Sequence, residues 1–325
     1  MLKPEIEDGQ ASLADPEFRG DVLSGLARRP RAIPARWFYD RRGSELFEEI
    51  TELPEYYPTR TEVALLQSAC PEVASRVGKG RAVIEFGSGS STKTPRLLHC
   101  VEPAAYVPID ISGDFLRASS AELAKGFPDL AVLPVEANFM HPVPLPAVVA
   151  DMPKLGFFPG STIGNMTPHV AADLLRAMRE SLGEGAMLLI GIDRVKDAGV
   201  LVPAYDDAAG VTGAFNLNLL DRINRELGAT IPVDAFRHKA VWNDDASRIE
   251  MHLEAVRDVV FTVEGRPFEM TAGETIHTEN SHKYGERGAR VLLRTGGWTP
   301  VAEWTDPKGW FSLILAEAKA PETAP

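Results

Sequence analysis

The stretch Ala82-Val83-Ile84-Glu85-Phe86-Gly87-Ser88-Gly89 decides the fold class. Its first five residues are mostly apolar and predict a short buried strand, and the glycines that follow predict a tight turn. A helical pattern begins after Thr94. A strand, a glycine turn and a helix in this order form a cradle for a nucleotide or cofactor, because glycine lets the backbone approach a ligand closely. The alternative is that Gly87 and Gly89 only make a turn.

The segments downstream of this turn alternate between strand-like and helix-like patterns. Helical spacing of apolar residues covers 112–125 and 168–182, where Thr167 and Pro168 suit a helix start. Short apolar runs predict strands at 81–86, 106–110, 131–135, 155–158 and 186–192. This alternation is typical of βαβ units, so we expect a parallel sheet with helices on both faces.

The rhythm changes after residue 193. A long helical pattern covers 211–227, and polar and apolar residues then alternate through 248–256 and 259–263 to a turn at 264–267, which predicts antiparallel strands. Two more strands, 298–305 and 310–315, are separated by a turn and predict a closing hairpin on the edge of the first sheet. Before residue 60 we expect short helical pieces, interrupted by Pro30, Pro34, Pro54 and Pro58.

Composition excludes several classes of partner. The 325 residues carry 46 acidic against 34 basic side chains, a net charge of −12, which disfavours nucleic-acid and anionic membrane surfaces. The acidic first residues and the lack of a long apolar run predict a cytoplasmic protein without a membrane helix. Cys70 and Cys100 lie 30 residues apart without a CxxC motif, so we expect two reduced, packed thiols.

Three ligand classes compete for the glycine turn. A P-loop is excluded because Thr92 stands where its second glycine belongs, and the same Thr92 departs from the GxGxxG pattern of dinucleotide sites. Asp110 follows Gly87 by 23 residues and closes the next strand, where a carboxylate can bind ribose hydroxyls. The pattern from Glu85 to Gly89, together with Asp110, favours S-adenosylmethionine.

Longer stretches make the assignment specific. The sequence resembles the family of L-histidine Nα-methyltransferases of ergothioneine biosynthesis, which trimethylate the α-amino group of histidine to hercynine. Matching stretches run through nearly the whole chain: 37–40, 53–62, 86–94, 159–165, 204–212, 214–216, 248–251 and 278–281. The resemblance implies a class I Rossmann-like methyltransferase sheet with a discontinuous α+β substrate-binding domain. We expect residues 60–193 with 285–325 to bind S-adenosylmethionine, and residues 1–59 with 194–284 to bind the substrate.

The resemblance also implies the site residues. The cofactor residues would be Gly87, Lys93, Asp110, Asn138 and Phe139. Asn138 departs from the family, which usually has an aspartate there to accept from the adenine amino group. The substrate residues would be Tyr56, Asn165, Tyr205, Phe215, Met251, Glu279 and Ser281, with Tyr39 beside the reacting amine as the catalytic group.

Several of these residues also have plain structural interpretations. Tyr39 and Tyr56 fit half-buried aromatic positions, and Asn165 fits a turn or helix cap. Glu279 and Ser281 would point to the same side of an extended segment, as a solvated polar strand would also arrange them.

Other chemistries lack their residues. The seven histidines form no HExxH motif, and no GxSxG elbow occurs, so we expect neither a metal centre nor a serine hydrolase. We expect a monomer that acts on a small molecule. The alternative function is N-methylation of another amino acid or small amine on the same scaffold, and outside this class an NAD-linked or noncatalytic Rossmann protein.

Overall fold

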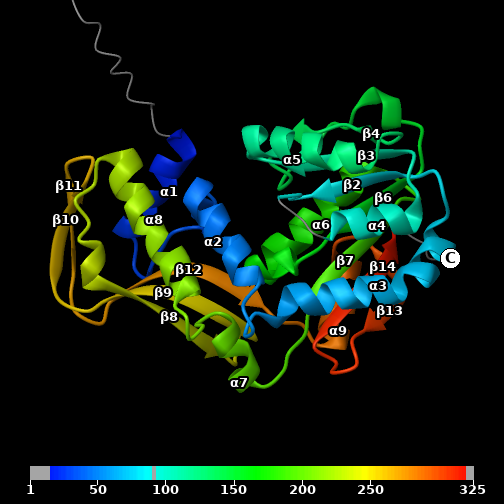
Figure 1. Cartoon of the computed structure of the whole chain (residues 1–325). Helices are drawn as coiled ribbons and strands as arrows, with labels where there is room; N and C mark the ends of the chain where they lie inside the picture. The colour runs from blue at the N-terminus through cyan, green and yellow to red at the C-terminus, as the bar shows by residue number, and fades with distance from the viewer. Residues whose placement is uncertain (1–14, 90–92, 320–325) are drawn as a thin grey trace, which may run out of the picture. The chain divides into compact units, whose positions relative to one another are not determined.

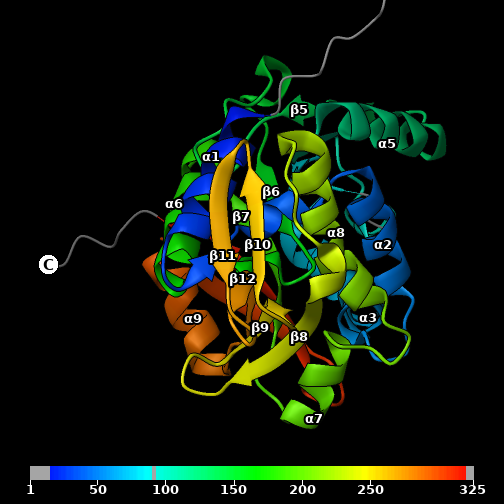
Figure 2. The same cartoon turned by 90° about the vertical axis from the view of Figure 1, so that its left-hand side faces the viewer.

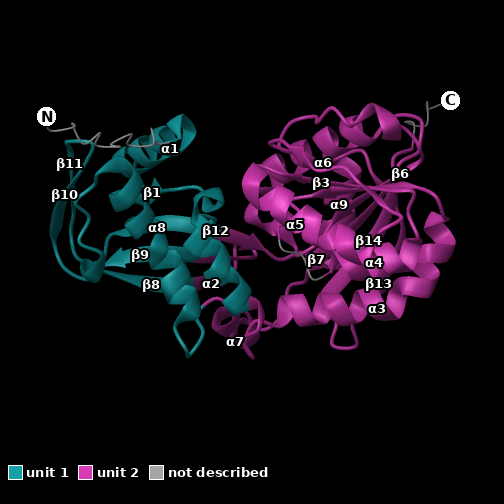
Figure 3. Ribbon diagram, turned by 45° about the horizontal axis from the view of Figure 1, so that its top comes forward, with its two compact units in different colours: residues 1–50, 206–240, 251–279 teal, residues 51–205, 241–250, 280–325 magenta. Residues whose placement is uncertain are grey.

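The computed structural model describes residues 15–89 and 93–319. Ser90 to Thr92 of the glycine turn, the acidic start and the tail after Lys319 lie outside the described residues. The chain divides into two compact units: unit 1 comprises residues 1–50, 206–240 and 251–279, and unit 2 comprises residues 51–205, 241–250 and 280–325 (Figure 3). The division into cofactor and substrate domains stays a prediction. None of the described helices is long and apolar enough to span a membrane.

Unit 2 contains the predicted parallel sheet. Its strands are β2 (Ala82–Phe86), β3 (Ala105–Asp110), β4 (Ala131–Val132), β5 (Val135–Glu136), β6 (Lys154–Phe158), β7 (Met187–Asp193), β13 (Thr299–Thr305) and β14 (Phe311–Glu317). The order is β13-β14-β7-β6-β2-β3-β4, with β5 also paired to β3. All pairs from β7 to β5 are parallel, whereas β14 is antiparallel to β7 and β13. The Rossmann-like sheet and its closing hairpin are therefore confirmed.

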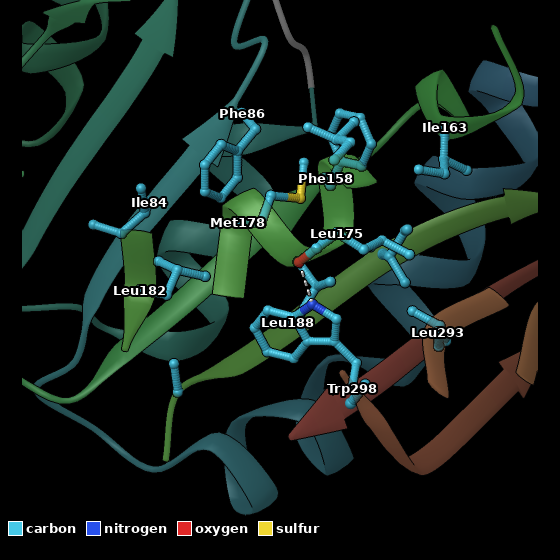
Figure 4. Close-up of a cluster of buried hydrophobic side chains, with 14 of the residues drawn as sticks. Ile84, Phe86, Phe158, Ile163, Leu175, Met178, Leu182, Leu188, Leu293 and Trp298 are labelled. Carbon is cyan, nitrogen blue, oxygen red and sulfur yellow. Dashed lines mark hydrogen bonds between the residues drawn. The ribbon is translucent and has the colours of Figure 1, made fainter. Parts of the chain in front are cut away.

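Helices cover both faces of this sheet (Figure 1). They are α3 (Tyr57–Val77), α4 (Thr94–Val101), α5 (Gly113–Gly126), α6 (Pro168–Leu182) and α9 (Glu286–Thr295). The short helix α7 (Ala198–Leu201) and the 3-10 turns η2 (Ala147–Val149), η3 (Thr162–Asn165) and η4 (Val202–Ala204) lie in the connections. One core lies under α6 and α9, where the buried Trp298 indole donates to the Leu175 carbonyl at 2.9 Å (Figure 4). The second core lies on the opposite face, under α3 and α4.

Two expectations for this unit were wrong. Residues 131–135 form two short strands because Pro134, between them, has no N–H to donate to a neighbouring strand. Cys70 on α3 and Cys100 on α4 form a disulfide, with Cα atoms 5.6 Å apart, instead of remaining reduced. The two helices pack against each other on the same face of the sheet, which brings cysteines 30 residues apart together.

Unit 1 is built from helices and two small sheets (Figure 2). Its elements are α1 (Pro16–Ala27), β1 (Arg31–Ala32), η1 (Ala35–Phe38), α2 (Arg41–Thr51), α8 (Val211–Leu227), η5 (Val233–Ala235), β10 (Val259–Val263) and β11 (Arg266–Met270). It also contains most of β8 (Phe236–Asn243), β9 (Arg248–Ala255) and β12 (Thr275–His282), whose ends at 241–243, 248–250 and 280–282 belong to unit 2. The sheet order is β1-β12-β9-β8, in which β1 pairs with β12 in parallel, and β10 pairs with β11 antiparallel. The predicted turn is confirmed: Glu264 and Gly265 both have positive φ and join β10 to β11.

Candidate functional site

The glycine turn lies at the carboxyl end of β2. Gly87 has a φ of 73°, and its N–H donates to the Ile109 carbonyl on β3 at 2.8 Å. A Cβ added at Gly87 would lie 3.3 Å from the ring of Phe139. Both the positive φ and the close ring therefore require glycine at this position.

Asp110 ends β3 next to this turn. Its carboxylate accepts from the Gly89 N–H at 3.3 Å and from the Ser112 N–H at 2.9 Å. Because β2 and β3 are parallel neighbours, their carboxyl ends meet at one edge of the sheet. A carboxylate has about four lone-pair positions, so Asp110 retains acceptor capacity for ligand hydroxyls.

Asn138 and Phe139 follow β5 at the same edge. The Phe139 ring lies 6.4 Å from Phe86 and 6.1 Å from Phe158, which fixes it over the ends of β2 and β6. The Asn138 side-chain oxygen accepts from the Met140 N–H at 3.1 Å. The structure thus places Phe139 against the glycine turn, with Asn138 as its neighbour in the chain.

Lys93 is held by a buried carboxylate that the sequence analysis missed. Its ammonium lies 2.6 Å from Glu62 of α3, whose side chain is fully buried. Both Glu62 oxygens accept from the Gly160 N–H, at 2.8 and 3.0 Å. Glu62 therefore ties the start of α4 to the loop after β6.

A second group of predicted residues meets elsewhere in unit 2. The Tyr205 hydroxyl lies 2.8 Å from the Ser281 Oγ, and the rings of Tyr56 and Tyr205 are 6.1 Å apart. Asn165 ends η3, and a Cβ added to the preceding Gly164 would lie 2.7 Å from the His282 carbonyl oxygen. The turn that carries Asn165 therefore packs closely on the end of β12, next to Ser281.

A buried network of charged side chains contacts Tyr205 and Ser281, and no sequence motif predicted this network. Lys283 contacts Tyr205, Ser281 and the Asp193 carboxylate, which also accepts from the Tyr57 hydroxyl at 2.7 Å. Burial alone would raise the pKa of Asp193, but the ammonium groups of Lys283 and Lys196 hold it below its usual value.

Tyr57 and Lys196 complete this network. The Lys196 ammonium donates to the Tyr57 hydroxyl at 2.7 Å and to Asp193 at 2.6 Å. Burial lowers the pKa of Lys196 to about 8, against the opposing effect of Asp193. Desolvation and the neighbouring Asp193 raise the pKa of Tyr57, so its hydroxyl keeps its proton.

Unit 1 contains the other predicted substrate residues. Tyr39 follows η1 and is 38% exposed, with its ring 5.8 Å from Phe215 and 5.7 Å from Phe47. Phe215 is buried on α8, whose first-turn amides of Val211 and Thr212 are capped by Asp207. Asp207 therefore fixes the start of the helix that carries Phe215.

Met251 and Glu279 lie on the strands of unit 1. Met251 is buried on β9, and its carbonyl accepts from the Thr278 hydroxyl of β12 at 3.0 Å. The His277 Nε2 donates to the Glu279 carbonyl at 2.9 Å and stacks on His252 with ring centroids 4.8 Å apart. Residues 275–282 form a strand, which is the extended backbone that the expected same-side arrangement of Glu279 and Ser281 requires.

The family model for histidine-specific, S-adenosylmethionine-dependent methyltransferases matches residues 18–318. The chain belongs to this family of histidine-specific methyltransferases. S-adenosylmethionine is accordingly its methyl donor, and Gly87 with its Phe139 wall, the Asp110 carboxylate and the strand ends fit that group.

Proteins similar to this chain occur in bacteria and fungi. A histidine N-alpha-methyltransferase of Mycolicibacterium smegmatis is 42% identical and covers 94% of this chain and 96% of that protein. A histidine N-alpha-methyltransferase of Mycobacterium tuberculosis is 41% identical and covers 92% of this chain and 94% of that protein. Ergothioneine biosynthesis protein 1 of Neurospora crassa is 29% identical over 89% of this chain and 34% of its own length.

A solved methyltransferase structure is also similar. An S-adenosylmethionine-dependent methyltransferase from Clostridium acetobutylicum aligns with a TM-score of 0.49 at 10% identity, covering 85% of this chain and 99% of that one.

Proposed function

We propose that this histidine-specific methyltransferase transfers three methyl groups in turn to the α-amino nitrogen of L-histidine and so forms hercynine, the first step of ergothioneine biosynthesis. The observation that carries the proposal is the 42% identity to a histidine N-alpha-methyltransferase over 94% of the chain. The family model spans residues 18–318, a range that contains parts of both units and the positions of all the proposed substrate residues. S-adenosylmethionine supplies an electrophilic methyl group on a sulfonium, which a neutral amine displaces in line.

The cofactor residues are assigned by the same argument. Gly87, Lys93, Asp110, Asn138 and Phe139 would hold S-adenosylmethionine at the carboxyl ends of β2, β3 and β5. The required glycine at 87 and the remaining acceptor capacity of Asp110 support this assignment. The Glu62–Lys93 pair would keep the lysine from moving when the ligand binds.

The substrate residues have distinct roles in the proposal. Asn165 and Tyr205 would bind the carboxylate of histidine, and Glu279 and Ser281 would bind its imidazole, with Tyr56, Phe215 and Met251 as further contacts. Holding both ends of the substrate aims its amine at the methyl group, an orientation effect that is worth several kcal/mol.

Tyr39 would lie beside the amine. A phenol accepts through its oxygen and offers its π face to the ammonium that forms, and neither contact requires a strong base. The amine must lose a proton before each transfer, because only the neutral form has a lone pair to form the new N–C bond. The exposure of Tyr39 is consistent with release of these protons to water.

The test is direct. The purified protein is incubated with S-adenosylmethionine and, separately, with each common amino acid, and the products are read by mass spectrometry. We expect species with one, two and three added methyl groups from histidine alone. Methylation of a different amino acid or amine in preference to histidine would favour the alternative substrate, and no methyl transfer to any of them would contradict the proposal.

A further inference from the structure

Lys283 follows β12 and directs its side chain into unit 2, where it has no contact with solvent. Its Nζ lies 2.7 Å from Asp193 Oδ2, 2.8 Å from the Tyr205 hydroxyl and 2.8 Å from Ser281 Oγ. An ammonium group has three N–H donors, so these three acceptors use all of them. Lys283 therefore has no donor left for a substrate, and any effect on a bound molecule passes through Tyr205 and Ser281.

These contacts constrain the two hydroxyl groups. Each oxygen accepts from Lys283, and because the two oxygens lie 2.8 Å apart, one hydroxyl donates to the other and a single O–H is left to point elsewhere. Hydrogen bonds from a charged donor are short and strong, and a hydroxyl that accepts one becomes a better donor itself. Lys283 thus restricts the directions of both hydroxyls and strengthens the one O–H that is left to donate to a bound molecule.

The network holds two ammonium groups, Lys283 and Lys196, around a single carboxylate, Asp193. Lys283 and Lys196 share one carboxylate, Asp193, because they bind its two different oxygens. The next acidic group, Asp306, acts on Lys196, and its carboxylate is held by the amides of Lys308, Trp310 and Phe311. Among the described residues, Lys283 has no second carboxylate within ion-pair distance. Buried positive charge without a full counter-charge is costly, so an anionic group near Tyr205 would be favoured.

We infer that Lys283 is a positioning residue that orients Tyr205 and Ser281 and supplies, through the Tyr205 hydroxyl, the positive charge that selects an amino acid with a free carboxylate. The inference rests on the proposed function, which places the substrate carboxylate at Tyr205. It predicts that Lys283 governs KM and carboxylate preference more than the rate of methyl transfer.

The experiment compares two matched variants. Lys283→Met removes the ammonium that contacts Tyr205 and Ser281, whereas Lys196→Met removes the ammonium on the other oxygen of the same Asp193. Each is assayed with L-histidine and with L-histidinamide, which lacks the carboxylate. Thermal unfolding and S-adenosylmethionine affinity show whether each variant is folded.

We expect Lys283→Met to raise KM for histidine about 10- to 100-fold, the size expected for charged hydrogen bonds, with a smaller change in kcat. Its preference for histidine over histidinamide should fall by a similar factor, whereas Lys196→Met should keep that preference. In a Tyr205→Phe background, Lys283→Met should cause little further change in the preference for histidine over histidinamide, because both substitutions remove the hydrogen bond between Lys283 and the Tyr205 hydroxyl.

Two results would overturn the inference. One is an equal loss on histidine and histidinamide in Lys283→Met, and the other is the same change of preference in Lys196→Met. If Lys283→Met does not fold, Lys283→Gln replaces it, because this variant removes the charge and keeps a polar group. A parental preference for histidine over histidinamide in Lys283→Gln would also contradict the inference. Failure of the parent protein to methylate histidine would contradict only the proposed function, and the comparison then uses the amino acid it accepts and its amide.

Discussion

The hydroxyl of Tyr106 donates to the carboxylate of Glu85 at 2.6 Å, and both side chains are buried between β2, β3 and the start of α4. Thr94 Oγ1 donates to the same carboxylate at 2.8 and 3.0 Å. Burial raises the pKa of Glu85 to about 7, although the hydrogen bonds from Tyr106 and Thr94 act in the opposite direction. Glu85 therefore lies beneath the glycine turn as a buried acid that titrates near neutrality.

This carboxyl predicts a pH dependence of stability. Because its pKa is higher in the folded chain than the usual 4.5, its stabilising contribution is complete below about 4.5 and is lost as pH rises through about 7. The loss amounts to at most about 3 kcal/mol. Glu85→Gln should remove this part of the pH dependence, measured by urea unfolding across that range. The exposed Glu184→Gln serves as a control, and a parental pH profile in Glu85→Gln would contradict the assignment.

Gly87→Val should abolish S-adenosylmethionine binding in a folded protein. A branched side chain at a φ of 73° is strained, and its Cβ would press on Phe139. Gly78→Val is the matched control, since Gly78 has a φ of 75° with no atom within 4 Å of an added Cβ. Both should lose about 1 to 2 kcal/mol of stability from backbone strain, but only Gly87→Val should lose binding by calorimetry. Unchanged affinity there would refute the cofactor assignment.

Asn138→Asp should bind S-adenosylmethionine as tightly as the parent or more tightly. The new carboxylate can still accept from the Met140 N–H and offers a stronger acceptor to the adenine amino group. Calorimetric titration of both proteins measures the difference. A loss of about tenfold, or 1.4 kcal/mol, would show that this chain binds adenine in a different way.

Glu279→Ala should lose most activity on histidine and gain relative acceptance of larger apolar rings such as that of tryptophan. A carboxylate that accepts from an imidazole N–H discriminates by about 1 to 3 kcal/mol. The measurement is kcat/KM for both amino acids. Parental kcat/KM for histidine in Glu279→Ala would remove the main physical support for imidazole recognition at this residue.

Ser281→Ala should reduce kcat/KM for histidine less than Glu279→Ala, because water replaces a hydroxyl more easily than a charge. It also leaves one donor of the buried Lys283 without its acceptor, so we expect a loss of stability of about 1 to 3 kcal/mol. Thermal unfolding separates this effect from the kinetic one. A larger loss of kcat/KM than in Glu279→Ala would reverse the proposed order of importance.

The sequence by itself determined the elements whose signals are local. The apolar run 82–86, the glycines after it and Asp110 predicted the cofactor edge of the sheet, because strand, turn and helix patterns depend on neighbouring residues. The helix at 211–227 was predicted with its exact bounds from its 3.6-residue period. Family resemblance added the substrate residues, of which Tyr56, Tyr205 and Ser281 meet in unit 2.

Only the tertiary structure decided which distant side chains became partners. Glu62 and Lys93, Cys70 and Cys100, and Asp193 and Lys283 are 30 to 90 residues apart, and no periodic pattern links them. A buried charge is tolerated only where packing delivers an opposite charge or hydrogen-bond donors. Folding brings these distant groups together. Lys283 after β12 and Asp193 at the end of β7 therefore become partners only when the sheet and its connections are formed.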